Sequence, residues 1–363
     1  VVDSPDLSRL YNAYWYGHHA AATKADHSTP SLVDLLSEKR VQTWLITDEP
    51  VIGQRAEVPH FSRQIVLPEG SDDPTTSWED TQLAHVFATV LEVLEQAQPP
   101  FFIWVHAQAM QSAWDAPYAM RAQFAEGEDP DAPEFTQPPE LHLEQDYDPD
   151  LLLGMQHAYG GQVALLDSCL GIVLDALSAH SLGTSTALLA TSARGYPLGE
   201  HRYVGRSETS LFSELLHVPW INLWPDAQGA AWRLPHIVQP ADLFTTVAKW
   251  MNVDSSQLAR WGRSLLPDDL PEPAQAANMF AYSCYQQQRA LRVPGWFLRG
   301  DQSELAELYV KPDDRWEFNE IANRCPAIVD ELMELAGLIE AAIQSGSRQQ
   351  LPALPEALLY GMP

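Results

Sequence analysis

The sequence is short of cysteine. Its three cysteines, Cys169, Cys284 and Cys325, are widely spaced and show no Cys-x-x-Cys pattern. An odd number without paired spacing argues against a disulfide framework and against a cysteine zinc site. No secretory leader is visible. We therefore expect reduced thiols and a cytoplasmic protein.

Positive charge is also scarce. The chain carries 21 Lys and Arg against 49 Asp and Glu, a formal net charge of −28. Such a charge repels a phosphate backbone, which excludes nucleic acid as an expected partner. Long unbroken apolar runs of about 18 residues are missing too, so we expect no membrane insertion. The partner stays unknown, and two alternatives remain. One is an anionic ligand bound in a local basic pocket, and the other is a protein bound to an acidic face.

General catalytic motifs are missing as well. The sequence contains no Gly-x-Gly-x-x-Gly, no Walker A loop, no Gly-x-Ser-x-Gly elbow and no His-Glu-x-x-His. Dinucleotide binding, P-loop chemistry, hydrolase-elbow chemistry and zincin chemistry are therefore not indicated. Any chemistry has to be sought in another pattern.

What is present is a globular α/β pattern. Apolar residues make up 45% and charged residues 19% of the 363 residues. Apolar strand-like runs alternate with stretches of helical periodicity, which predicts a large, mostly parallel sheet flanked by helices. The predicted strands are 41–46, 64–67, 101–105, 186–191 and 218–224, and the predicted helices are 78–97, 151–180 and 240–251.

Composition also divides the chain. We assign 1–253 to the α/β domain, with an acidic, Pro-rich insertion at 126–150, and 254–280 to a linker. A smaller C-terminal α+β subdomain follows at 281–345, and a tail at 346–363. In this subdomain we expect strands around 281–292, 296–299 and 308–310, and a helix at 326–344.

Six stretches of the chain share a pattern in order and spacing: 99–118, with the segment PPFFIWVH, then 159–177, 188–201, 215–225, 238–247 and 307–322. Together they resemble the type I sulfatases of the alkaline-phosphatase-like superfamily. The resemblance runs from near Val1 to about Ala342 and implies an alkaline-phosphatase-like sandwich. It implies a family of sulfuric ester hydrolases that use calcium or another divalent ion.

The resemblance also implies a site, and this chain departs from it. The family nucleophile, a Cys or Ser in C/S-x-P-x-R, falls on Pro5, although Arg9 matches the arginine. Moving the register to Ser4 or Ser8 loses the arginine spacing. Proline has no nucleophilic atom. The first strand and its metal-binding aspartates would lie before Val1, outside this sequence.

Three further positions differ. The family lysine falls on Asp48, the histidine of the DPHAPY segment on Gln111, and the metal-binding pair on Ala193 and Arg194. A methyl group and a fixed cation replace metal ligands there, and a hard divalent cation needs oxygen ligands. By contrast, His106, Glu200 and His201 match the family at supporting positions.

We therefore interpret the chain as a degenerate sulfatase with no intact catalytic set and no expected metal. Arg9 and Arg194 are candidate anion-binding residues. The chain then acts as a binding or interaction protein.

Two alternatives stay open, so enzymatic activity is undecided. One is an active ester hydrolase with a rearranged site, completed by residues upstream of Val1 and using Ser4 or Ser8. The other is a scaffold that uses the acidic face.

Overall fold

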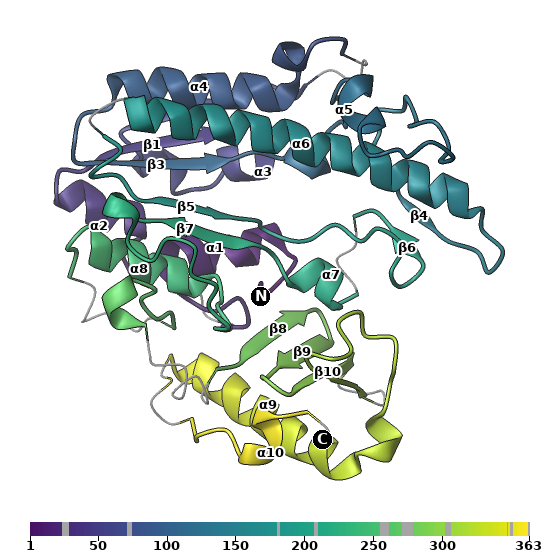
Figure 1. Ribbon diagram of the computed structural model, residues 1–363. Coiled ribbons are helices and arrows are strands. Elements are labelled where there is room, and N and C mark those ends of the chain that lie inside the picture. The colour runs from purple at the N-terminus through teal and green to yellow at the C-terminus, as the bar shows by residue number, and fades with distance from the viewer. Residues whose placement is uncertain are drawn as a thin grey trace.

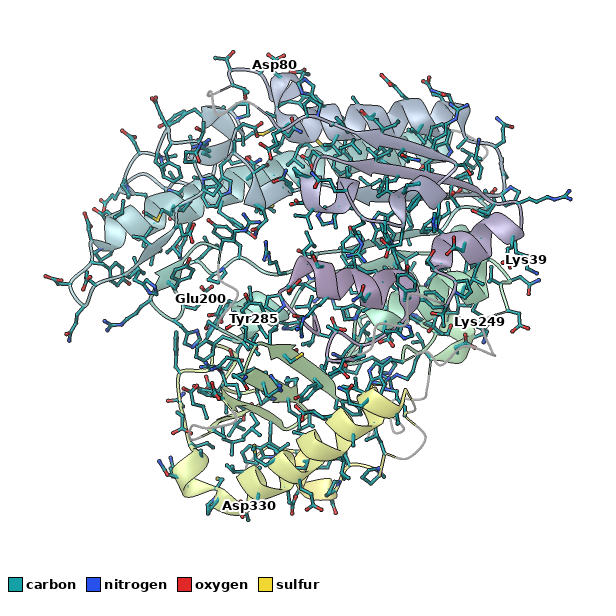
Figure 2. All side chains as sticks on the ribbon, turned by 180° about the vertical axis from the view of Figure 1, so that it is seen from behind. Lys39, Asp80, Glu200, Lys249, Tyr285 and Asp330 are labelled. Carbon is teal, nitrogen blue, oxygen red and sulfur yellow. The ribbon has the colours of Figure 1, made fainter. Side chains whose placement is uncertain are left out.

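The structure is a computed structural model of the chain, and its main elements form one large α/β part and one smaller C-terminal part (Figure 1). It describes residues 1–23, 29–70, 75–179, 182–206, 210–254, 261–270, 279–301, 306–346, 348 and 351–361. Charged side chains such as Lys39, Asp80, Lys249 and Asp330 point outward from the ribbon (Figure 2).

Parallel strands form the heart of the large part. Strand β1 (Gln42–Thr47) lies between β2 (Arg63–Val66) and β3 (Phe101–His106), and both neighbours run parallel to it. Strands β5 (Leu188–Thr191) and β7 (Trp220–Leu223) form a separate antiparallel pair. All five strands fall within one or two residues of the predicted runs.

Helices cover the strands from two sides (Figure 1). On one side lie α4 (Gln82–Gln96) and α6 (Pro149–Ala179). On the other lie α1 (Leu7–Tyr16), α2 (Leu32–Glu38) and α8 (Ala241–Trp250). The predicted helix 78–97 is divided, because the Thr81 hydroxyl accepts the Ala84 N–H and starts α4 there. A 3₁₀ turn at Trp78–Asp80 precedes it. The parallel sheet and flanking helices are thus confirmed.

Helix α6 has 31 residues and follows the predicted span, apart from its end at His180, which lies outside the described residues. Its length and composition would suffice to cross a membrane. It nevertheless packs on α4 and on the short helix α5 (Tyr118–Ala122). This packing is that of a layer helix over a sheet, and the absence of membrane insertion stays a prediction.

The guanidinium of Arg121 binds backbone carbonyls of the acidic segment 126–150. Buried Arg121, on α5, donates to the carbonyl oxygens of Ala116 at 3.0 Å, Pro133 at 2.8 Å and Phe135 at 2.6 Å. It also donates to the Trp114 carbonyl. The segment adds the strand β4 (Leu141–His142), which pairs with β6 (Tyr203–Val204).

The C-terminal part confirms the predicted α+β subdomain. Four antiparallel strands lie in the order β11-β10-β9-β8. They are β8 (Ala281–Tyr285), β9 (Gln288–Arg292), β10 (Trp296–Asp301) and β11 (Glu307–Val310). Helix α9 (Pro326–Ser345) buries Leu332 and Ile339 against this sheet. Of the predicted linker, 255–260 and 271–278 lie outside the described residues, while Trp261 is buried in the same core.

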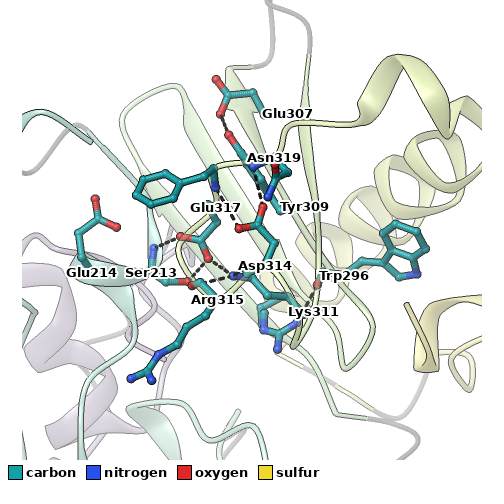
Figure 3. Close-up of polar contacts among 12 residues, drawn as sticks. Ser213, Glu214, Trp296, Glu307, Tyr309, Lys311, Asp314, Arg315, Glu317 and Asn319 are labelled. Atoms are coloured by element: carbon teal, nitrogen blue, oxygen red, sulfur yellow. Dashed lines mark hydrogen bonds and ion pairs between the residues drawn. The ribbon is translucent and has the colours of Figure 1, made fainter. Parts of the chain in front are cut away.

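A polar cluster joins the two parts (Figure 3). Buried Glu317 forms an ion pair with Lys311 and accepts hydrogen bonds from the backbone N–H of Ser213, at 3.0 Å, and from the Ser213 hydroxyl. Ser213 begins helix α7 (Ser213–Leu216) of the large part. His201 of the large part adds a contact between its Nε2 and the Glu317 carbonyl oxygen at 3.2 Å. Glu317 therefore connects the C-terminal part to the large one.

Replacing Glu317 tests this role. Glu317→Ala leaves the Lys311 ammonium buried without its partner, which costs about 3–5 kcal/mol for a buried ion pair. We expect the free energy of unfolding in urea to fall by that order. Glu331→Ala, on the exposed face of α9, serves as control and should change it by less than about 0.5 kcal/mol. Equal effects of both substitutions would contradict the role.

A second buried carboxylate lies at the start of the chain. Asp3 is fully buried and its Oδ2 accepts the Ala20 N–H at 2.9 Å, while Oδ1 has no hydrogen-bond partner among the described residues. Burial raises the pKa of Asp3 to about 7. The folded chain therefore holds this carboxyl protonated over a range in which the unfolded chain ionises it.

The stability of the fold should depend on pH through the ionisation of Asp3. A raised acid pKa stabilises the fold at low pH, and this contribution is lost as the pH rises from about 4 to about 7. Asp3→Asn keeps the acceptor for Ala20 and cannot ionise. We expect it to raise the free energy of unfolding at pH 8 by up to about 4 kcal/mol, seen as a higher melting temperature. This gain should shrink toward pH 4. Asp330→Asn, at an exposed position, is the control, and a pH-independent gain would contradict the argument.

Candidate functional site

The site lies where three strands end. Asp48 follows β1, Gln111 follows β3 after a short turn, and Ala193 and Arg194 follow β5. The carboxyl ends of strands are the usual place for ligand sites in open α/β sheets. Pro5 joins them from the segment just before α1.

Arg194 connects three chain segments. Its Nη1 donates to the Pro5 carbonyl oxygen at 3.1 Å, and its Nη2 donates to Gln111 Oε1 at 3.3 Å. The positions singled out for nucleophile, histidine and metal pair therefore meet in space, with a guanidinium at their centre. Arg194 is partly buried, so its charge acts in a medium less polar than water.

His106, the last residue of β3, is held by a chain of hydrogen bonds. Trp104 Nε1 donates to the Tyr11 hydroxyl oxygen at 3.0 Å, and this hydroxyl lies 2.7 Å from His106 Nδ1. The hydroxyl donates to Nδ1 or accepts from it, according to the tautomer of the ring. Burial and then the charge of Arg194 lower the pKa of His106 to about 4. The ring is therefore neutral at pH 7.

Asp48 connects the ends of two strands. The carboxylate is buried, and it accepts the Gln108 N–H at 2.8 Å and the Gln82 Nε2 at 3.2 Å. Its backbone carbonyl accepts Gln108 Nε2 at 2.6 Å. Burial raises the pKa of Asp48. These contacts hold the turn after β3 against the end of β1 and leave no cation at the position of the family lysine.

Three predicted positions do not line the cavity described below. Ser8 and Arg9 are exposed on the first turn of α1. Ser4 is fully buried, and its Oγ accepts the Asp6 N–H at 3.3 Å. Anion binding by Arg9 and nucleophilic roles for Ser4 and Ser8 thus stay predictions without support from this geometry.

Glu200 and His201, which match the family at supporting positions, make contacts that stabilise the loop after β5. Glu200 turns back on its own loop, where Oε2 accepts the Leu198 N–H at 2.8 Å (Figure 2). His201 stacks on Phe212, with ring centroids 3.5 Å apart, besides bonding Glu214. The Glu214 carboxylate raises the pKa of His201, against the effect of burial. Both residues therefore shape the loop after β5.

A cavity of about 910 Å³ adjoins the site. Strands β3 and β5 line it along their whole length, and α4, α6 and α8 contribute apolar side chains. Gln111, His106 and Arg194 lie at its polar end. Neither this cavity nor the Tyr11–His106 contact was foreseen from the sequence, although the aromatic spacing of YNAYWY in α1 marked a buried face.

The residues present do not fit a divalent metal ion. Across the described ranges, no group of three or more His, Cys, Asp or Glu side chains is placed to share one. Ala193 offers a methyl group, and the Arg194 guanidinium is a cation that cannot donate a lone pair. Calcium needs six to eight oxygen ligands. What this arrangement can do is donate charge-assisted hydrogen bonds to an anion from Arg194.

Comparison with known proteins agrees with the fold. The sulfatase family model matches residues 7–253, and the chain belongs to the sulfatase family. A search of curated proteins gave no sequence match.

Solved structures show the same architecture. BT4656, in complex with its substrate D-glucosamine-2-N,6-O-disulfate, superposes with a TM-score of 0.72 at 15% identity over 95% of this chain and 90% of its own. The phosphonate monoester hydrolase of Agrobacterium radiobacter gives 0.69 at 16% identity over 94% and 86%. A putative sulfatase from Bacteroides thetaiotaomicron gives 0.65 at 18% identity over 95% and 83%. At these identities the likeness establishes the alkaline-phosphatase-like fold alone.

Removing the Arg194 charge should change the neighbouring imidazole. In Arg194→Gln we expect the pKa of His106 to rise toward its ordinary value, because one of its two depressing causes is gone. NMR titration of the imidazole resonances measures this. Arg9→Gln, on the exposed turn of α1, should leave it unchanged. An unchanged His106 pKa in Arg194→Gln would show that the two side chains do not interact.

Proposed function

We propose that this sulfatase-family protein does not hydrolyse sulfate esters and instead binds a small oxyanion, or an anionic group of a larger ligand, beside Arg194. The single observation that carries the proposal is the position of the guanidinium. It bridges the Pro5 carbonyl and Gln111 where β3 and β5 end.

The chemistry of the site supports the absence of turnover. Pro5 offers only a carbonyl oxygen, already taken by Arg194, and has no side-chain nucleophile. Sulfuryl transfer in this family needs an attacking oxygen and several cations around the sulfate oxygens. Gln111 and Asp48 carry no positive charge, and Arg194 is a cation that contacts Gln111.

Electrostatics supports the choice of an anion. The chain is strongly acidic, with a net charge of −28, so a basic group inside the fold stands out against its surroundings. The planar guanidinium presents paired N–H donors that match the oxygens of a sulfate, phosphate or carboxylate. His106, which lines the same cavity, is neutral at pH 7 and adds no second charge.

Binding and turnover should be measured on the same samples. We expect isothermal titration with sodium sulfate at low ionic strength to detect binding, and Arg194→Gln to weaken it about 10- to 100-fold, as a charge-assisted hydrogen bond of about 1.5–3 kcal/mol implies. Arg9→Gln is the matched control and should bind like the unaltered chain. If Arg194→Gln binds sulfate equally well, the proposed anion site is wrong.

Turnover is tested with 4-nitrophenyl sulfate and with a phenyl phosphonate ester, in the presence of calcium, manganese or zinc. We expect no metal-dependent product release. Metal-dependent hydrolysis that disappears in His106→Ala or Gln111→Ala would replace this proposal by its alternative, an active hydrolase completed by residues upstream of Val1.

A further inference from the structure

His201 lies at the contact between the two parts of the molecule, and both of its ring nitrogens face oxygen atoms. Nδ1 lies 2.7 Å from Glu214 Oε1, on α7, and Nε2 lies 3.2 Å from the backbone carbonyl oxygen of Glu317, in the C-terminal part. A carbonyl oxygen only accepts hydrogen bonds, and so does an ionised carboxylate. Both contacts are therefore hydrogen bonds only when each ring nitrogen carries a proton, as in the imidazolium form.

A neutral imidazole cannot make both contacts. It has one N–H group, so the lone pair of its other nitrogen would face an oxygen atom at 2.7 or 3.2 Å. The side chains of His201 and Glu214 are only 18% and 7% exposed, so most of this pair is screened from water. A buried polar atom without a partner is costly, and the geometry therefore favours the charged form of the ring.

The charges around His201 favour the same form. Burial lowers the pKa of His201, but the carboxylate of Glu214 and then Glu317 outweigh it, so the pKa lies above its ordinary value of 6.5. Glu317 is itself paired with buried Lys311 (Figure 3). The imidazolium of His201 thus shares a partly buried site with two carboxylates and one ammonium.

The other charged or titratable side chains of the surrounding elements have contacts or exposure of their own. Glu200, on the same loop, accepts the Leu198 N–H at 2.8 Å, and the neighbouring Arg202 is exposed. Arg315, in the C-terminal part, is also exposed. Burial lowers the pKa of His217, which follows α7. His217 therefore loses its proton at a lower pH than His201, and the two titrations are separable.

One aromatic ring separates His201 from a further cation. The imidazole stacks on Phe212 with ring centroids 3.5 Å apart, and Arg299 Cζ, on β10, lies 3.7 Å from the centroid of the same ring. Two groups this close to one centroid occupy opposite faces of the ring. Arg299 is paired with Glu307 at 2.6 Å. Phe212 of the large part is therefore held between His201 and the C-terminal sheet, and a charged imidazole strengthens this stack.

The loop that carries Arg194 is held on α7 at two points. Near its start the Gly195 N–H donates to the Leu215 carbonyl oxygen at 2.8 Å, and a side chain at Gly195 would collide with the Glu214 carbonyl oxygen. Near its end His201 contacts the Glu214 carboxylate. The position of the loop therefore depends on α7 at one end and on the protonation of His201 at the other.

We propose that His201 is a proton-operated switch of the contact between the two parts. With two ring protons it holds Glu214 and the Glu317 carbonyl together, and it fixes the end of the loop that carries Arg194. Loss of one proton to solvent leaves a lone pair against one of these oxygens, so the contact and the end of the loop both loosen. The effect on Arg194 rests on the anion binding proposed above, whereas the contact between the parts does not depend on it.

The contact should be strongest in acid. For a histidine with a raised pKa, the stabilisation is fully present below the ordinary value of 6.5 and is lost as the pH rises through the pKa of the folded chain. Asp3, with a pKa of about 7, changes the stability of the whole fold in the same direction. The switch is therefore measured at the contact itself, against a reference elsewhere in the fold.

Amide hydrogen exchange at Ser213 measures the contact, because its N–H donates to Glu317 Oε2 at 3.0 Å across the two parts. Protection is expressed relative to the intrinsic rate at each pH and to the amides of β9 and β10, which lie inside the C-terminal sheet. We expect the protection of Ser213 to fall at least about 10-fold between about pH 6 and about pH 9, as loss of a charge-assisted hydrogen bond implies. Imidazole nitrogen NMR at the lower pH should show two ring protons on His201.

Three variants separate His201 from other groups. In His201→Gln, which does not titrate, we expect no such fall. Glu214→Gln keeps the imidazole but removes a carboxylate that raises its pKa, so the fall should move to lower pH. His60→Gln is the matched control, because exposed His60 pairs with Asp34 at 2.8 Å within the large part, and it should keep the fall of the unaltered chain.

The proposal is overturned if Ser213 protection does not change with pH, if the fall persists in His201→Gln, or if it stays at the same pH in Glu214→Gln. Titration with sodium sulfate over the same pH range tests the effect on Arg194. We expect binding about 10-fold weaker at the higher pH, and no such change in His201→Gln. Sulfate affinity that is independent of pH while Ser213 protection falls overturns the effect on Arg194. Absence of sulfate binding at every pH contradicts the proposed function alone, because the exchange experiment uses no anion.

Discussion

A parallel sheet is stable when helices cover both of its faces and its strands pair along their length, and the large part of this protein is built around that requirement. The first half is met by α4 and α6 on one side and by α1 and α8 on the other. The second is met at β1, which has a partner on each side. Between β3 and β5 no described strand provides such pairing, and the cavity of about 910 Å³ lies there, beside the site at the strand ends.

The sequence predicted the elements well because their signals are local. The apolar run at 101–105, the helical periodicity of 240–251 and the ordered stretches that resemble sulfatases each depend on neighbouring residues. The predicted α/β class and the C-terminal α+β part are therefore confirmed. Helix boundaries were less certain, as at Thr81, where a single capping hydroxyl moves the start of α4.

The contacts of the site depended on distance in space and were harder to predict. Arg194 was identified by its place in a motif, but its bonds to Pro5 and Gln111 span 189 and 83 residues of sequence. Arg9 was placed beside it by motif spacing alone, whereas the turn of α1 directs it to solvent. The hydrogen bonds of Arg121 and the joint at Glu317 carry no sequence signature, because carbonyl oxygens and a buried carboxylate accept from any suitably placed donor.

The guanidinium of Arg194 also changes what can regulate this crevice. A charge carried by a coordinated ion varies with the supply of that ion, with chelators and with protons that compete for its ligands. Arginine keeps its proton in proteins, and its charge is part of the chain. The charge that Arg194 contributes beside β5 is therefore a constant of the folded protein and does not depend on the supply of a metal ion. Under the proposed function, an anion beside Arg194 is released by competition or by unfolding, and not by loss of an ion.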